Sequence, residues 1–179
     1  MTWDMGIARK RSISVSSFIY YLVFGFYLLY STLTGTMLGQ AEWILKSGKF
    51  IVLICSSGII LKFLVENRFR VRECIIACIM LGITVLVFIY MDDYFPFFLI
   101  LFMYGARKCD ARMLAKIYLL CTGGIVLLAT ILSQIGIIED RLFYRDNGLL
   151  RHSMGMTYVT IWAGVLFSII AVYIYLRHS

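Results

Sequence analysis

Long apolar runs without charged residues are the feature that most limits what this chain can fold into. They occupy residues 18–38, 50–65, 74–91, 94–106, 117–138 and 153–176. A helix needs about 20 residues to cross a hydrocarbon core of roughly 30 Å, so most of these runs are long enough. Within the runs only Lys62 is charged, and its long stem allows the ammonium group to reach the interface. The runs predict an all-α, polytopic integral membrane protein with about six transmembrane helices.

The composition excludes a water-soluble domain. Hydrophobic residues make up 61% of the chain and charged residues 15%. Soluble domains average roughly 45–50% and about 25%, respectively. The stretches between the apolar runs are too short for a separate domain, so residues 1–179 are predicted to form one transmembrane helical domain.

The run 94–106 is the shortest, and it contains the one proline, Pro96. A re-entrant segment is one interpretation of so short a run. A spanning helix is favoured, because Asp92 and Asp93 form an acidic turn before it and Pro96 falls in its first turn, where a missing N–H costs least.

Basic residues gather at alternate ends of the runs, and this sets the orientation. They lie before the first run, from the end of the second run to the third, between the fourth and fifth, and after the sixth: Arg9, Lys10, Arg11, Lys62, Arg68, Arg70, Arg72, Arg107, Lys108, Arg112, Lys116 and Arg177. The positive-inside rule makes these ends, and both termini, cytoplasmic. The net charge of +7 is therefore attributed to membrane flanks rather than to nucleic-acid binding, and the first run to a retained signal anchor.

Neither the cysteines nor the glycines predict a cofactor. The cysteines form no metal-ligand pattern and are interpreted as small apolar helix residues: Cys55, Cys74, Cys78, Cys109 and Cys121. Gly123, Gly124 and Gly136 are expected to let helices approach closely rather than to cradle a phosphate. No metal and no cofactor are predicted.

The loop between the fifth and sixth runs concentrates the polar chemistry. Arg141, Arg145 and Arg151 lie on the predicted outer side, where the orientation rule disfavours arginine. They either bind a phosphate group or pair with the neighbouring carboxylates, which are Glu139, Asp140 and Asp146. His152 is either an acid–base group or an interfacial residue. The pair Asp92–Asp93 is interpreted mainly as a solvated turn, with a role as a base as the alternative.

This loop and its flanks resemble a known family. The segment Arg-Asp-Asn-Gly-Leu-Leu-Arg-His-Ser-Met-Gly over 145–155 is similar to the signature of Wzy-type polysaccharide polymerases, which make exopolysaccharide, capsule or O-antigen chains. The matching positions are Arg145, Gly148, Arg151, Ser153 and Gly155. The resemblance covers residues 133–177. Where the family has an aromatic residue and a proline, this chain has Met156 and Val159, and its length corresponds to the amino-terminal half of such polymerases.

The resemblance implies a membrane glycosyltransferase in the bacterial cytoplasmic membrane. It would join undecaprenyl-diphosphate-linked oligosaccharide repeat units at the outer face, alongside the flippase and chain-length regulator of the same pathway. Arg145 and Arg151 would hold the diphosphate, and Asp146 or His152 would deprotonate the acceptor hydroxyl. Arg141, Gly148, Ser153 and Gly155 are the further residues expected to bind substrate.

Two other classes stay open. A chain with six short-looped spans and both termini inside also suits the substrate-binding subunit of a vitamin importer. Such a subunit would place polar contact residues within its spans, whereas here the polar residues gather in the outer loop. A catalytically inert assembly factor is the third alternative.

Overall fold

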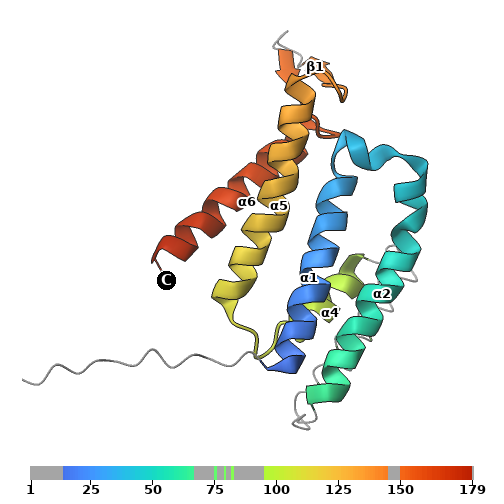
Figure 1. Cartoon of the computed structure of the whole chain (residues 1–179), viewed down its shortest axis with the longest axis vertical. Coiled ribbons are helices and arrows are strands. Elements are labelled where there is room, and N and C mark those ends of the chain that lie inside the picture. Colours follow the sequence, from blue (N-terminus) through green and yellow to red (C-terminus); the bar gives the residue numbers. More distant parts are fainter. Residues whose placement is uncertain are drawn as a thin grey trace, which may run out of the picture.

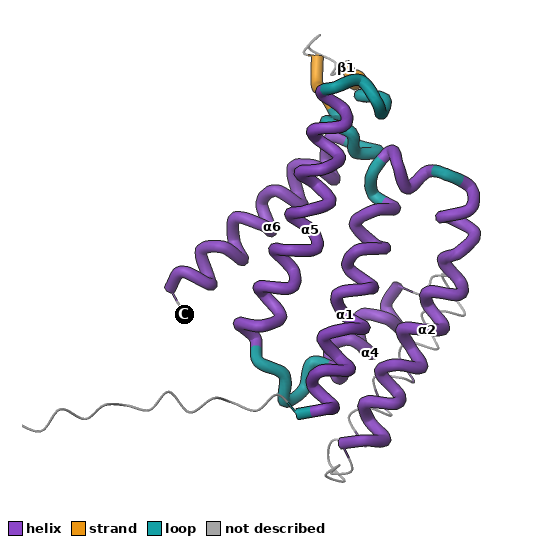
Figure 2. Tube along the Cα trace, viewed as in Figure 1, coloured by secondary structure: helices purple, strands orange, loops and turns teal. Residues whose placement is uncertain are grey.

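The computed structural model describes residues 14–66, 75, 79, 82, 95–144 and 150–178, and nothing below concerns the remainder. Within these residues the chain is mostly helical (Figure 2). In chain order its elements are α1 (Val15–Thr34), the short 3₁₀ helix η1 (Met37–Gln40), α2 (Glu42–Glu66), α4 (Phe95–Gly105), α5 (Ala111–Gln134), β1 (Leu142–Tyr144), β2 (Leu150–His152) and α6 (Val159–His178).

Four of the described helices are long and apolar enough to cross a membrane. These are α1, α2, α5 and α6, with 20 to 25 residues each. Their outer surfaces carry large exposed apolar side chains, such as Leu53 at 69% and Phe167 at 74% exposure, and α6 buries none of its residues. Surfaces of this kind are stable against lipid and not against water. The prediction of a multi-pass helical membrane protein is confirmed at this level.

The helices begin and end at residues that satisfy their terminal backbone groups. Ser14 caps α1 by accepting from Ser17 N at 3.2 Å, and Asp110 caps α5 by accepting from Arg112 N at 3.0 Å. Both helices end four residues before the predicted runs do. Beyond these ends, Met37 and Leu38 belong to η1 and residues 135–138 form a turn, in which Gly136 has φ +80°.

Helix α1 lies at the centre of the described bundle (Figure 1). It packs against α2 on one side and α5 on the other, with α6 against α5 and α4 against α2. The buried core contains Tyr20, Cys55, Ile59 and Phe102. An added Cβ at Gly105 would lie 2.5 Å from the Tyr20 ring, so only glycine permits this approach of α4 to α1.

The predicted packing role of the glycine pair in α5 is wrong for the described chain. A Cβ added at Gly123 or Gly124 would meet nothing within 4 Å. Close contacts are instead made from α2, where a Cβ on Gly58 would lie 2.5 Å from Val23. Sequence alone does not show which face of a helix a glycine occupies.

Lys62 is fully buried rather than extended along the surface. Its ammonium group donates to the carbonyl oxygens of Gly105 and, at 2.7 Å, Arg107, and it lies 5.2 Å from the centre of the Tyr20 ring. Gly105 is the last residue of α4 and Arg107 lies in the turn that follows it, where main-chain carbonyls lack partners within the helix. Lys62 therefore joins the end of α4 to α2.

The count of six spans stays a prediction. Helix α4 has 11 residues, which is about 16 Å at 1.5 Å per residue and roughly half of a hydrocarbon core. Pro96 does fall in its first turn. The run 74–91 lies outside the described residues, apart from isolated positions within it.

The all-α prediction is wrong at one place. The loop after α5 forms a two-stranded antiparallel sheet, and the last helix begins at Val159 instead of residue 153. The four long helices alternate in direction, so this sheet lies at the same end of the bundle as the α1–α2 turn, and residues 106–110 lie at the other (Figure 1).

Candidate functional site

The hairpin of β1 and β2 carries most of the predicted site residues. The strands pair Leu142 with His152, Phe143 with Arg151 and Tyr144 with Leu150. Residues directly opposite each other in an antiparallel pair share a face of the sheet. Phe143 and Arg151 therefore lie on one face, and Leu142 and His152 lie on the other.

Backbone hydrogen bonds fix the hairpin to the α1–α2 turn. Thr157 N donates to Gly35 O at 3.0 Å, and Met37 N donates to Gly155 O at 2.9 Å. Between them Thr36 and Met156 form an isolated antiparallel bridge, and both are at most 1% exposed. The segment that follows the hairpin is thus held by the first two helices as well as by α5.

Gly155 is required at its position for two independent reasons. Its φ is +78°, a conformation that residues with a side chain rarely adopt. A Cβ there would also lie 2.6 Å from the carbonyl oxygen of Ala129 in α5. Gly155 is therefore a packing and turn residue in this structure.

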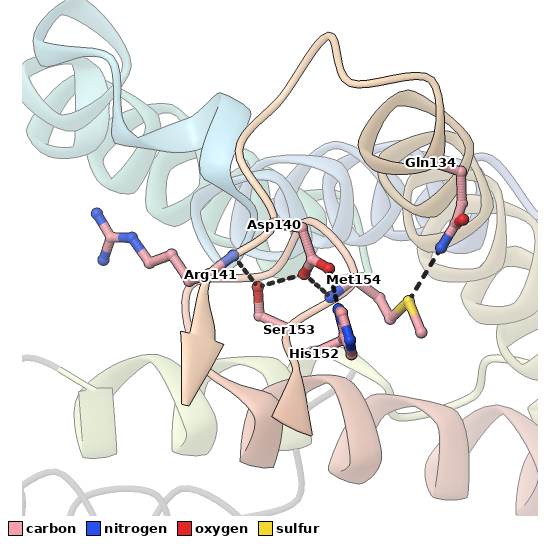
Figure 3. A network of polar contacts seen from close by, with 6 residues as sticks. All are labelled: Gln134, Asp140, Arg141, His152, Ser153 and Met154. Atoms are coloured by element: carbon pink, nitrogen blue, oxygen red, sulfur yellow. Dashed lines mark hydrogen bonds and ion pairs between the residues drawn. The ribbon is translucent and has the colours of Figure 1, made fainter. Parts of the chain in front are cut away.

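Asp140 organises the base of the hairpin (Figure 3). Its Oδ1 accepts from Met154 N at 2.9 Å and from Ser153 Oγ at 3.2 Å, and its Oδ2 lies 2.6 Å from His152 Nδ1. Ser153 Oγ in turn accepts from Arg141 N at 3.0 Å. Met154 has φ 52°, and the bond from its N–H to Asp140 stabilises this unfavourable conformation.

The hydroxyl of Ser153 is already committed to this network. The residue has no exposed surface, so direct contact with a substrate would require the hairpin to open. Substrate binding by Ser153 and Gly155 stays a prediction, and the geometry assigns both of them the task of holding the loop in place.

The pKa of the Asp140 carboxyl lies below its usual value. Partial burial by itself would raise the pKa, but hydrogen bonds from His152, Met154 and Ser153 outweigh that effect, with a smaller contribution from the charge of the imidazole. Asp140 is thus a carboxylate at neutral pH and accepts from His152 Nδ1–H. The carboxylate orients the ring and leaves Nε2 as the atom that can take a proton.

The Asp140–His152 pair has the arrangement of a carboxylate-oriented base. The His152 side chain is 48% exposed and that of Asp140 is 24% exposed, so the imidazole is accessible while its partner is partly covered. Sequence reasoning considered Asp140 only as a partner of the arginines, in one of two alternatives, and missed this pair. Their separation of 12 positions in the sequence concealed it, because only the hairpin brings them together.

Arg141 and Arg151 are exposed, and no carboxylate in the described part of the chain pairs with either guanidinium. Arg141 extends away from the Asp140 network in Figure 3. The alternative in which Asp140 neutralises an arginine is therefore wrong in this structure. Arg145, Asp146 and Gly148 lie outside the described residues, and their predicted roles stay predictions.

The hairpin also presents aromatic side chains that the sequence did not single out. Phe143 and Tyr158 form a ring pair, with 6.0 Å between their centroids and 39° between their planes.

Among the residues that the structure describes, no cluster of three or more His, Cys, Asp or Glu side chains could hold a metal ion.

Comparisons with protein families, curated proteins and solved structures found no match to this chain. The class that the fold defines is a multi-pass helical membrane protein with a polar hairpin at one end of its helices. The similarity to polysaccharide polymerases rests on the residues of the loop alone.

Proposed function

We propose that the chain is a polymerase-type membrane glycosyltransferase that acts on undecaprenyl-diphosphate-linked oligosaccharides, with the hairpin as its site. The observation that carries the proposal is the pair of exposed arginines, Arg141 and Arg151, which have no carboxylate partner among the described residues. Guanidinium groups bind phosphate oxygens through two parallel charge-assisted hydrogen bonds. A diphosphate is the ligand that best matches this charge at the end of an apolar bundle.

The position of the hairpin supports a ligand that is part lipid and part sugar. The helices below it expose apolar side chains, while the hairpin exposes charged and aromatic ones. A lipid tail can therefore stay in the bilayer while its diphosphate and glycan reach the hairpin. By the positive-inside rule the end with residues 106–110 is cytoplasmic, because Arg107, Lys108 and Arg112 gather there. The hairpin then faces outward.

The chemistry that this site supports is transfer of a glycan from one lipid diphosphate to the next unit. The oxygen of the acceptor hydroxyl forms a bond to the anomeric carbon of the donor and its proton passes to water, because the arginines and His152 lie on opposite faces of the hairpin. The bond between that carbon and the diphosphate oxygen breaks, and undecaprenyl diphosphate leaves with the electron pair. Arg141 and Arg151 stabilise the negative charge that develops on the leaving group.

The proposal is tested by arginine variants in cells in which the native gene is deleted. Arg141→Ala combined with Arg151→Ala should shorten the surface polysaccharide to single repeat units, and Arg145→Ala should act in the same direction. Lys46→Ala is the matched control, because Lys46 is an exposed cation near the same end that pairs with Glu42 at 2.9 Å. Polymer length is read on a gel, and membrane insertion is read by immunoblotting.

Long polymer in the double arginine variant would overturn the proposal. A transporter subunit would keep solute uptake in the same variant, because the hairpin would be peripheral to a pocket among its spans. An unchanged polysaccharide after deletion of the gene would leave the assembly-factor and transporter alternatives.

A further inference from the structure

Two open depressions flank the hairpin, and they share one pair of aromatic side chains. The first has a volume of about 190 Å³ and is lined by Phe143, Tyr144, Arg151, Tyr158, Val159 and Thr160. The second has a volume of about 440 Å³ and is lined by Glu139, Asp140, Arg141, Leu142, Phe143 and Tyr158. Phe143 and Tyr158 thus separate two depressions that each contain one arginine.

The strand register explains why both arginines flank the same rings. Arg151 is directly opposite Phe143 and shares its face of the sheet. Arg141 precedes Phe143 by two residues, and Ser153 N donates to Arg141 O at 3.1 Å, which continues the ladder beyond the strand. Alternation along the strand therefore places Arg141 on the same face as Phe143.

The aromatic pair is partly open to solvent. Tyr158 is 56% exposed, and Phe143 is half-buried. Exposed aromatic surface with a polar rim is typical of a binding site. The electron-rich face of an aromatic ring repels an anion, so the rings favour a ligand group other than the phosphate itself.

We propose that Phe143 and Tyr158 form a sugar-binding subsite that holds the first pyranose ring of the glycan next to the diphosphate. A pyranose ring presents C–H groups on one face, whose partial positive charge suits the face of an aromatic ring. Its hydroxyl groups lie at the rim, where Glu139 accepts hydrogen bonds and Arg141 donates them. This inference rests on the proposed function, because the sugar lies next to the diphosphate only when both belong to one lipid-linked substrate.

The alternative to a sugar is that membrane lipid contacts these rings, since Tyr side chains also anchor proteins at the membrane interface. The carboxylate of Glu139 and the two guanidinium groups line the same depressions, which favours a hydroxylated ligand over lipid tails. The two occupants differ in what they predict for a sugar that has no lipid attached.

The test uses the whole chain in lipid nanodiscs and measures saturation transfer by NMR to neutral methyl glycosides of glucose, galactose and N-acetylglucosamine. At least one glycoside should receive saturation, mainly on the C–H groups of one ring face. Phe143→Leu and Tyr158→Leu should each weaken its binding by roughly three- to tenfold. Tyr158→Phe keeps the ring and is the matched control, which should bind as the native chain does.

The same samples separate this inference from the proposed function. Inorganic pyrophosphate, followed by phosphorus NMR, should bind to Phe143→Leu and lose its binding in the double Arg141→Ala, Arg151→Ala variant. Saturation that is absent from every glycoside, or unchanged in both leucine variants, would overturn the sugar subsite and leave the proposed polymerase activity intact. Glycoside binding in a chain that makes no polymer would overturn the activity and leave the subsite.

Discussion

At the scale of single residues, Asp140 links the chemistry of the loop to its conformation. Its carboxylate accepts from His152, Ser153 and Met154 at once, so it orients the imidazole and closes the hairpin base. A hydrogen bond to a charged group contributes about 1.5–3 kcal/mol. Loss of the charge should therefore loosen the hairpin, and loss of the whole side chain should loosen it further.

The lowered pKa of Asp140 predicts how the hairpin responds to acid. Its pKa in the folded state lies below the usual 3.8, so the unfolded chain binds the proton first as pH falls, and the stability from this group is full above that value. This stability is lost as pH drops from about 4 through the folded pKa. Hydrogen exchange should show the protection factor of the Met154 amide falling over that range.

Asp140→Asn keeps the shape of the side chain and removes its titration. Its Met154 amide should be less protected at neutral pH, with no further step in the acid range. A step of the native size in Asp140→Asn would contradict the assignment of the acid transition to this carboxyl.

Replacement of Gly155 is the second single-residue change for which the structure predicts a clear loss of stability. Gly155→Ala adds a Cβ at positive φ and against the Ala129 carbonyl, which should cost about 1–3 kcal/mol of unfolding free energy. Gly124→Ala is the matched control: its Cβ meets nothing, and alanine favours a helix by up to about 1 kcal/mol. Thermal unfolding in detergent compares them, and equal midpoints would contradict this account of Gly155.

At the scale of elements, Lys62 decides how α4 is held. A buried ammonium group is costly unless it is fully satisfied, and here two main-chain carbonyls at the end of α4 and the Tyr20 ring surround it. Tyr20 adds a second attachment, since its hydroxyl donates to Phe102 O at 2.8 Å. The short helix α4 is thus fixed from α1 and α2 at its carboxyl end.

Lys62→Met should release this end of α4. The variant keeps the length of the side chain but leaves the carbonyls of Gly105 and Arg107 without this donor, which should cost about 1–3 kcal/mol of stability. Lys46→Met removes an ion pair whose side chains are 79% and 85% exposed, and it should change stability by less than about 1 kcal/mol. Chemical denaturation in mixed micelles gives both values, and a smaller loss in Lys62→Met than in Lys46→Met would contradict the role of Lys62.

At the scale of the whole molecule, the alternating long helices place the hairpin and residues 106–110 at opposite ends. In intact cells, a membrane-impermeant maleimide should therefore label Tyr144→Cys and should reach His178→Cys only after permeabilisation. The native chain, which has cysteines of its own, supplies the background signal. Labelling of both variants in intact cells would contradict the alternation, and labelling of His178→Cys alone would reverse the orientation.

The sequence predicted the membrane class well because length and apolarity are local properties that a run of residues carries by itself. It did not predict the hairpin, because two three-residue strands have no periodicity long enough to recognise. The partner of Asp140, the burial of Lys62 and the open faces of Gly123 and Gly124 each depend on contacts between distant segments. Arg151 and His152 were identified from their residue types, whereas Phe143 and Tyr158 gave no signal among so many other aromatic residues.

Reconstitution is the most direct test of the proposal that the hairpin binds a lipid-linked diphosphate and transfers its glycan. The purified chain is placed in liposomes with undecaprenyl-diphosphate-linked repeat units, and glycan length and released undecaprenyl diphosphate are followed together. The native chain should give a ladder of polymer with one lipid diphosphate released per added unit, and the Arg141→Ala, Arg151→Ala chain should give none. A native chain that inserts correctly and leaves every repeat unit unjoined would contradict it.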